Sequence, residues 1–345
     1  MGTHKSREIR LKSRPDGMPV AANFELAEVE LPDPGPGQIL VRNSYMTVDP
    51  YMRGRMVDRR SYVPPFQVGE AMTGGAVGQV VAAGSGAPFK VGDHVLSMAG
   101  WREMFVANGP ELMVQKVEPI PGVGIQSYLG SLGMPGMTAY VGLLRIAEFK
   151  PEDSVFVSAA SGAVGQVVVQ IAKAKGSKRI VGSAGSDEKC AYLKEIGCDE
   201  TINYKTCGDL NAAVAKAFPD GIGVYFDNVG GEHLEAAIGN MRQFGRLAEC
   251  GMIEQYNATE PPPGPRNMIL IVGLSLTVRG FIVSNHFDIM PDFMRDMATW
   301  IQAGKMKWRE TIYDGIARAP EAFIGLFKGE NFGKMLVRVG PDKAV

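Results

Sequence analysis

The chain has 345 residues, which is long enough for two domains, and its 45% hydrophobic and 21% charged residues are ordinary for a water-soluble globular protein. The net charge of −1 argues against a nucleic-acid partner or an acidic membrane surface, because both favour a basic protein face. Residues Met1–Arg14 are polar and basic, unlike a signal peptide, and no apolar stretch is long enough to span a bilayer, so we expect a cytoplasmic protein without a membrane partner.

The N-terminal third is predicted to be rich in β-strands. Polar and apolar residues alternate in Glu8–Leu11 and Phe24–Glu30, and a loop of proline and glycine precedes a third strand at Gln38–Asn43. Glycines and valines in Gly69–Gly84 indicate strands that bend around a small barrel. From Gln126 to Phe149 the hydrophobic period becomes that of a helix, so we expect a domain boundary near this segment.

An apolar run that ends in small residues, Val155–Gly165, predicts a strand and a tight turn, followed by a helix over Gln166–Lys175. Ala160, Gly162 and Gly165 stand at the three small-residue positions of a dinucleotide-binding fingerprint. In that motif the first position permits the turn, the second lets backbone approach a pyrophosphate, and the third lets the helix pack against the strand. The amides at the helix start would then hold the phosphates.

The next strand, Arg179–Val181, completes the βαβ unit that this motif requires. An NAD site usually has Asp or Glu at the end of this strand, but here the strand runs into Gly-Ser-Ala-Gly. Hydrogen-bonding and cationic residues that suit the extra phosphate of NADP occur nearby: Ser186, Lys189, Lys175, Lys178 and Arg179. We choose Lys189 as the phosphate contact; the alternative is a solvated lysine on an exposed helix start.

Strands and helices alternate from here to residue 250, which predicts a doubly wound parallel sheet. Ligands of such sheets lie at the carboxyl ends of the strands, where the sequence places Asn228, Cys250 and Gly251. The loop Met252–Arg266 is either a lid over the site or an exposed connection. A later strand is expected to end at Phe281–Val283, and a Met-rich helix to span Phe287–Ala303.

The cysteines and histidines are scattered singly, without a CxxC pair or the spacing of metal ligands. They are Cys190, Cys198, Cys207, Cys250, His4, His94, His233 and His286. We therefore expect reduced thiols and no metal site.

Several motifs occur in order over almost the whole chain: VDPYMRGRM, AASGAVGQVV, AGSDEK, NYK, FDNVGG, CGMI followed by YN, and GENFGKMLV. Together they resemble the zinc-independent medium-chain dehydrogenase/reductase superfamily, and within it the leukotriene hydroxy-dehydrogenase, prostaglandin reductase and curcumin reductase group. The resemblance implies an α/β fold in which a GroES-like β-rich catalytic domain, residues 1–128 completed by 310–345, accompanies a Rossmann doubly wound parallel-sheet domain, residues 129–309. It also implies NADP(H) as cofactor, a small-molecule substrate and a homodimer.

By position, the resemblance assigns the pyrophosphate loop, the phosphate-binding lysine and the other cofactor contacts. They fall on Ala163, Val164, Gly165, Gln166, Lys189, Tyr204, Asn228, the stretch Cys250–Tyr256 with Gly251, Phe281, Ile282, Val283 and Asn331. Tyr51 stands where zinc-dependent relatives carry a metal-binding cysteine, in agreement with the expected absence of a metal. One departure is Gly273, which occupies the position of a tyrosine in prostaglandin-reducing relatives and makes prostaglandins a less secure substrate.

The expected reaction is reduction of the carbon–carbon double bond of an α,β-unsaturated ketone or aldehyde. NADPH would supply hydride to the β-carbon, and the α-carbon would then be protonated. Tyr51 and Tyr256 are the candidate catalytic residues, and the alternative for each phenol, favoured more for Tyr256, is a buried structural group. The alternatives are an NADPH-dependent quinone reductase and a non-catalytic NADPH-binding sensor. A homodimer would pair through the sheet edge at Leu274–Val283, a run that core burial explains equally well.

Overall fold

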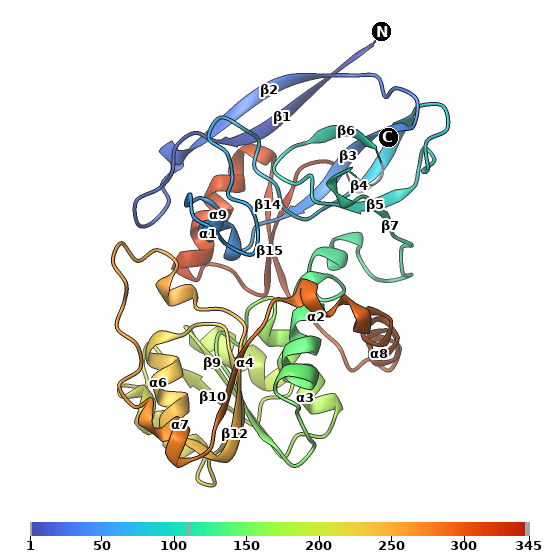
Figure 1. Ribbon diagram of the computed structural model, residues 1–345. Coiled ribbons are helices and arrows are strands. Elements are labelled where there is room, and N and C mark those ends of the chain that lie inside the picture. Colours follow the sequence, from blue (N-terminus) through green and yellow to red (C-terminus); the bar gives the residue numbers. More distant parts are fainter. Residues whose placement is uncertain (1, 109–110, 342–345) are drawn as a thin grey trace. The chain divides into compact units, whose positions relative to one another are not determined.

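The computed structural model describes residues 2–108 and 111–341, which form two compact units (Figure 1). The first unit contains the described residues up to Leu129, then Glu310–Asn331 and those from Met335 onward. The second unit contains Gly130–Arg309 and Phe332–Lys334. Within the described ranges, every helix is too short or too polar to cross a membrane.

The first unit is built on β-strands, as its alternating sequence predicts. A hairpin of β1 and β2 accompanies a seven-stranded sheet with the order β14-β15-β3-β4-β5-β7, in which β6 also pairs with β3. The strands are β1 (Thr3–Leu11), β2 (Phe24–Pro32), β3 (Gln38–Thr47), β4 (Ala76–Ala83), β5 (His94–Ser97), β6 (Met104–Asn108), β7 (Gln115–Lys116), β14 (Glu310–Asp314) and β15 (Lys334–Arg338). The helices are η1 (Ala21–Asn23), α1 (Tyr51–Arg55), η2 (Glu111–Met113), η3 (Ile125–Leu129), η7 (Ile316–Arg318) and α9 (Ala319–Lys328).

Close packing of β4 on β3 explains one glycine of the predicted barrel segment. A Cβ at Gly78 would lie 2.3 Å from the carbonyl oxygen of Arg42, so only glycine allows the strands to approach this closely. The core of the unit centres on the fully buried Trp101, whose ring stacks on Phe24 and meets Phe323 edge to face. Aromatic burial of this kind stabilises the hairpin and α9 against the sheet.

The second unit is a doubly wound parallel sheet, as predicted. Its strand order is β10-β9-β8-β11-β12-β13, and every neighbouring pair is parallel. The strands are β8 (Ser154–Val157), β9 (Arg179–Ala184), β10 (Glu200–Asn203), β11 (Ile222–Asp227), β12 (Met241–Glu249) and β13 (Thr277–Gly280). The order reverses between β8 and β11, so a crevice for a ligand is expected at the carboxyl ends of these two strands.

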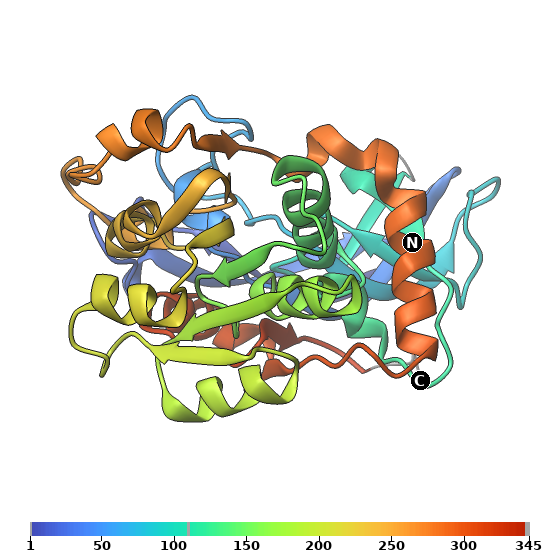
Figure 2. The same ribbon diagram turned by 90° about the horizontal axis from the view of Figure 1, so that it is seen from below.

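Helices cover both faces of this sheet, and Figure 1 shows α3 and α6 on opposite sides of it. They are α2 (Met134–Tyr140), η4 (Val141–Ile146), α3 (Gly165–Ala174), α4 (Asp187–Glu195), α5 (Leu210–Ala217), α6 (Gly231–Gly239), η5 (Ile253–Gln255), α7 (Ile269–Gly273), η6 (Val283–Ile289) and α8 (Met290–Gln302). The long orange helix in Figure 2 is α8, which packs on α2 through Phe293 and Tyr140, with the Tyr140 hydroxyl 2.9 Å from Asp296 Oδ2.

Two predicted boundaries in the C-terminal half are wrong. The strand expected to end at Phe281–Val283 is β13, which ends at Gly280 because its partner β12 ends at Glu249 and offers no further backbone to pair with. The helix expected from Phe287 begins at Met290, because a kink at His286 confines the preceding turns to η6 and Pro291 stands in the first turn of α8.

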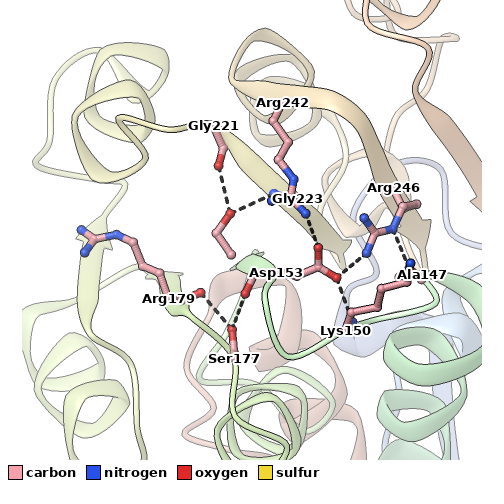
Figure 3. Close-up of polar contacts among 10 residues, drawn as sticks. Ala147, Lys150, Asp153, Ser177, Arg179, Gly221, Gly223, Arg242 and Arg246 are labelled. Atoms are coloured by element: carbon pink, nitrogen blue, oxygen red, sulfur yellow. Dashed lines mark hydrogen bonds and ion pairs between the residues drawn. The ribbon is translucent and has the colours of Figure 1, made fainter.

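A buried ion-pair cluster joins three strands of the second unit (Figure 3). Asp153, immediately before β8, is fully buried and pairs with Arg242 and Arg246 of β12. The same carboxylate accepts a hydrogen bond from the Lys150 amide at 2.8 Å, so both of its oxygens have partners. Ser154 connects this cluster to β11, because its hydroxyl donates to the carbonyl of Gly221 and accepts from the Gly223 amide. This polar network fixes the amino ends of the strands.

Candidate cofactor site

The turn between β8 and α3 has the strand–turn–helix context that the fingerprint requires. Its left-handed residue is Ala159, with φ of 45°, directly before Ala160, the first small-residue position of the fingerprint. Ala160 lies under β9, where its Cβ would be 2.8 Å from a Cβ placed on Gly182. The strain at Ala159 is therefore a feature of this site that the fingerprint pattern did not reveal.

The two glycines of the fingerprint have the separate roles that the motif assigns to them. A Cβ at Gly165 would lie 2.6 Å from the carbonyl oxygen of Ala159, so glycine is needed for the helix to pack on the turn. A Cβ at Gly162 would meet only that same carbonyl oxygen, at 3.1 Å, and is otherwise in the open. The backbone at Gly162 is thus accessible to a ligand.

The amides that follow Gly162 suit an anion. Gly162 and Gln166 donate to carbonyl groups inside the turn, whereas the amides of Ala163, Val164 and Gly165 donate to none in the described part of the chain. These three amides stand at the start of α3, where the helix dipole also favours negative charge. They match three of the residues predicted for the pyrophosphate.

Gln166, the fourth predicted residue of this loop, uses its side chain for internal contacts. It is buried, and its Oε1 accepts from the Tyr192 hydroxyl at 2.7 Å and from the Arg309 amide at 3.0 Å. Its own amide donates to Gly162. Gln166 therefore holds α3 against neighbouring elements.

A segment near the C-terminus pairs directly with the fingerprint turn, which sequence reasoning missed. The Gly333 amide donates to the carbonyl of Ser161 at 2.9 Å, and Gly333 forms a bridge with Gly162. A Cβ at Gly333 would lie 1.8 Å from the carbonyl oxygen of Arg309. The predicted contact Asn331 precedes this segment by two residues but belongs to the first unit. The glycine in the closing GENFGKMLV motif was the available signal.

The other side of the expected crevice is the end of β11, where Asp227 organises a turn. Its Oδ1 accepts from the amides of Val229 and Gly230 at 2.8 and 2.9 Å, and from the Ser158 hydroxyl at 3.0 Å. The predicted residue Asn228 donates to Ser158 twice, from its amide to Oγ and from Nδ2 to the carbonyl. These bonds join the ends of β8 and β11. Sequence reasoning named Asn228 but missed Asp227 and Ser158.

At the end of β9, two lysines and a tyrosine stand where an NAD site has an acidic residue. Ser186 caps α4 by accepting from the Lys189 amide, and Lys189 is half-buried. Burial, and then the neighbouring charge of Lys205, lower the pKa of Lys189. A Cβ at Gly185 would lie 2.7 Å from the Tyr204 hydroxyl and 3.2 Å from Lys205 Cε, so glycine leaves room beside these side chains. Two repelling cations next to a phenol favour an anionic ligand.

The other cations expected to support a 2′-phosphate site lie elsewhere, so that prediction is wrong. Lys175 pairs with Asp296, Lys178 pairs with Asp220, and Arg179 pairs with Glu200. Arg179 is the first residue of β9, and these pairs belong to the amino end of the strand. The sequence pattern could not separate the two ends, because all these cations lie within a short stretch of chain.

The end of β12 brings together Cys250, Gly251 and Tyr256. The amides of Cys250 and Gly251 both donate to the Asp227 carbonyl, at 2.9 and 3.1 Å. The Tyr256 hydroxyl accepts from the Met252 amide at 3.3 Å and would be 3.0 Å from a Cβ on Gly251. Burial and the nearby acids Asp227 and Glu249 raise the pKa of Cys250 to about 12, so the thiol is protonated at neutral pH.

The long loop after η5 is anchored away from the fingerprint turn. Arg266 forms a salt bridge with Glu235 of α6, and Pro262–Arg266 lines a hollow of about 630 Å³ over the starts of α5 and α6. Of the predicted loop, only the first part, around Met252 to Tyr256, lies at the end of β12.

The residues after β13 differ in their surroundings. The ring of Phe281 packs edge to face on Phe226, and both rings would clash with a Cβ on Gly142. Ile282 and Val283 are partly exposed and lead into η6.

Gly273 occupies the position at which the sequence comparison expects a tyrosine in prostaglandin-reducing relatives. It is exposed, and a Cβ there would meet no atom within 4 Å.

Tyr51 is the first residue of α1 in the first unit. Burial, followed by the negative charge of Asp49, raises the pKa of its phenol, and Arg55 acts in the opposite direction. A phenol in such surroundings donates a hydrogen bond more readily than it ionises.

Among the described residues, no group of three or more His, Cys, Asp and Glu side chains is placed to hold a metal ion.

Comparisons with known proteins agree with this geometry. Residues 7–115 match the family model described as the N-terminal domain of oxidoreductase, and residues 163–301 match the one described as zinc-binding dehydrogenase. The chain is 42% identical over 350 residues to the NADPH-dependent curcumin reductase of Escherichia coli, covering 99% of this chain and 100% of that protein. It is 41% identical over 343 residues to the 2-alkenal reductase (NADP(+)-dependent) of Nicotiana tabacum, covering 98% of both chains. The crystal structure of CurA in complex with NADPH from Vibrio vulnificus superposes with a TM-score of 0.91 at 40% identity, over 97% of this chain and 99% of that one.

Proposed function

Because the chain belongs to the medium-chain dehydrogenase/reductase superfamily, in the group of prostaglandin, curcumin and alkenal reductases, we propose that it reduces the carbon–carbon double bond of α,β-unsaturated ketones and aldehydes with NADPH. The observation that carries the cofactor part of the proposal is the group of side chains at the end of β9, where Lys189 and Lys205 approach each other beside Tyr204 without an acidic residue on the strand end. The double-bond chemistry rests on the similarity to curcumin and alkenal reductases.

The described residues fit NADPH at two places. The amides of Ala163, Val164 and Gly165, together with the open backbone at Gly162, would hold the pyrophosphate. Lys189 and Tyr204 would hold the 2′-phosphate, whose negative charge relieves the repulsion between the two lysines. Asn228, Cys250, Gly251, Phe281, Ile282, Val283 and Asn331 remain proposed contacts for the rest of the cofactor.

When bound, NADPH supplies a hydride to the β-carbon of the enone. The chain must orient the two reacting carbons and stabilise the negative charge that develops on the carbonyl oxygen. We assign a hydrogen bond to that oxygen to the Tyr51 phenol, whose raised pKa keeps its proton in place. Tyr256, at the end of β12, is the second candidate for this bond. Protonation at the α-carbon completes the saturated product.

The test is NADPH oxidation by the purified protein against linear enals, aryl enones such as curcumin, and small quinones, with NADH in parallel. The proposal expects a saturated ketone or aldehyde as product, and faster turnover with NADPH than with NADH. Hydroquinone as the sole product would indicate a quinone reductase. NADPH binding without oxidation of any compound would indicate a sensor.

Tyr51→Phe should lower turnover with little change in NADPH affinity, whereas unchanged turnover would remove Tyr51 from the mechanism.

Independence from zinc is part of the proposal. It rests on Tyr51, which stands in VDPYMR where zinc-dependent relatives carry a cysteine. Metal analysis of the purified protein should find less than one zinc per chain, and treatment with a chelator should leave turnover unchanged.

We also propose a homodimer that pairs through β13. This strand is the last in the sheet, Thr277–Gly280 is exposed, and exposed apolar side chains of Met268, Ile269 and Val272 lie just before it. An exposed strand edge next to apolar surface favours pairing with a second copy. Leu276 is buried, so the candidate run Leu274–Val283 contributes partly to the core and partly to this edge.

A further inference from the structure

Two carboxyl groups meet at the carboxyl ends of neighbouring strands, beside the proposed cofactor crevice. Asp227 ends β11, Glu249 ends β12, and the two residues are direct partners in the parallel ladder. Partners in a parallel pair present their side chains on the same face of the sheet, with Cα atoms about 5 Å apart. Asp227 is fully buried, and both carboxyl oxygens of Glu249 are shielded from solvent.

The hydrogen bonds to this pair are strongly asymmetric. Asp227 Oδ1 accepts four of them, from the Ser158 and Tyr225 hydroxyls and from the amides of Val229 and Gly230. No donor among the described residues reaches Asp227 Oδ2, or either oxygen of Glu249. The donors of the described residues therefore gather on one oxygen of Asp227, and both oxygens of Glu249 lack one.

Among the described residues, no cation is one of the charges that shift the pKa of Glu249. The titratable groups that interact with the pair are Tyr225 on β11, Cys250 after β12, His233 on α6 and Glu254 on η5. Burial lowers the pKa of His233 to about 4, so this imidazole is neutral at physiological pH. Two ionised carboxylates in contact in a dry site repel strongly, and such pairs retain one proton.

We propose that Glu249 is a neutral carboxylic acid in the folded chain and donates its proton to Asp227 Oδ2, which makes it a positioning residue for the turn at residues 228–230. The cofactor-binding consequence rests on the function proposed above. Through Ser158, Asp227 ties this turn to the fingerprint turn, so the fifth hydrogen bond fixes both walls of the crevice. Burial and the charge of Asp227 raise the pKa of Glu249 to about 8, so the bond is lost in mildly alkaline solution.

The proton itself is tested on the cofactor-free protein. Infrared spectra at pH 7 should contain the C=O stretching band of a buried carboxylic acid, which disappears in Glu249→Gln and in the wild type at pH 10. Between pH 4.5 and about 8, the unfolded chain releases the Glu249 proton and the folded chain retains it. The wild type should therefore lose stability relative to Glu249→Gln as the pH rises through this range.

The positioning role is tested by NADPH binding, followed by fluorescence titration from pH 6 to 9.5. The wild-type Kd should rise roughly tenfold as the pH passes about 8, the size expected for one hydrogen bond to a charged group. Glu249→Gln, whose amide replaces the donor, should abolish this rise. Glu249→Leu should bind weakly throughout, since it leaves Asp227 Oδ2 without a donor.

Glu152→Gln is the matched control, because Glu152 is an exposed carboxyl group of the same unit, outside the proposed cofactor site. It should retain the wild-type pH dependence. Absence of the carboxylic acid band, or the same pH dependence in the wild type and Glu249→Gln, would overturn the proposal. If NADPH does not bind at any pH, the proposed function fails, and the infrared and unfolding measurements still decide the state of Glu249.

Discussion

Lys189 is the residue on which discrimination between the two nicotinamide cofactors should depend. Its helix starts at a serine cap, the residue is half-buried, and its pKa is lowered by burial and by Lys205. These surroundings support the proposed phosphate contact over a solvated lysine. The pattern around it indicated a phosphate contact because the strand end lacks an acidic residue, whereas Lys205 entered the site only through folding.

Replacement of Lys189 by Ala should raise the KM for NADPH about 10- to 100-fold, the range for loss of a hydrogen bond to a charged group. The KM for NADH should change little, because NADH lacks the 2′-phosphate. Steady-state kinetics with both cofactors measure the effect. Lys194→Ala, an exposed lysine on the same helix, is the control and should resemble the wild type. An equal loss with both cofactors would contradict the assignment.

His233 should make stability depend on pH in the acidic range. Its ring packs on Tyr204, and burial lowers its pKa from 6.5 to about 4. Between these values the unfolded chain binds a proton that the folded chain does not, so stability falls as the pH falls from 6.5 to 4. The loss should reach about 3 kcal/mol. Urea unfolding at several pH values in this range should show a smaller loss of unfolding free energy in His233→Phe than in the wild type. An equal dependence of the unfolding free energy on pH in both proteins would refute the interpretation.

At the scale of elements, the pattern of small residues identified the strand–turn–helix around residues 155–175, but it did not indicate which residue has the strained backbone. That residue is Ala159, one position before the first small residue of the fingerprint. Similarly, the apolar pattern extended β13 into Phe281–Val283, because hydrophobic residues continue past the point where the partner strand ends. The hydrophobic pattern of the sequence indicates which residues are apolar, but hydrogen bonding to the neighbouring strand decides where a strand ends.

The Asp153 cluster is the element-scale feature with the largest expected effect on stability. Asp153→Asn leaves Arg242 and Arg246 without their buried countercharge (Figure 3). Breaking a buried ion pair from one side costs about 3–5 kcal/mol. Urea denaturation of the variant should show this loss. Asp288→Asn, which removes an exposed pair with Arg145, should cost less than about 1 kcal/mol. A small effect at Asp153 would mean that water or neighbouring groups solvate the arginines.

At the scale of the whole molecule, the edge of the second unit decides assembly. Val278→Lys places a charge in the exposed strand β13 and should shift a dimer to monomer in light scattering at micromolar concentration. NADPH affinity of the variant is measured in parallel, because the proposed cofactor contacts Phe281–Val283 directly follow β13. Val91→Lys, at an exposed valine of the first unit, should leave assembly unchanged. A protein that is monomeric before substitution would rule out this interface.

The sequence by itself determined the α/β class, the β-rich first part, the alternating strands and helices of the second, and the residues at the fingerprint turn. These follow from hydrophobic period and from small residues at fixed spacing, both of which act over a few neighbouring positions. Only the tertiary structure decided that Gly333 pairs with Ser161, that Asp227 joins two turns, and that Glu249 stands against Asp227. Such contacts depend on strand order and register between residues distant in the chain, and no local pattern encodes them.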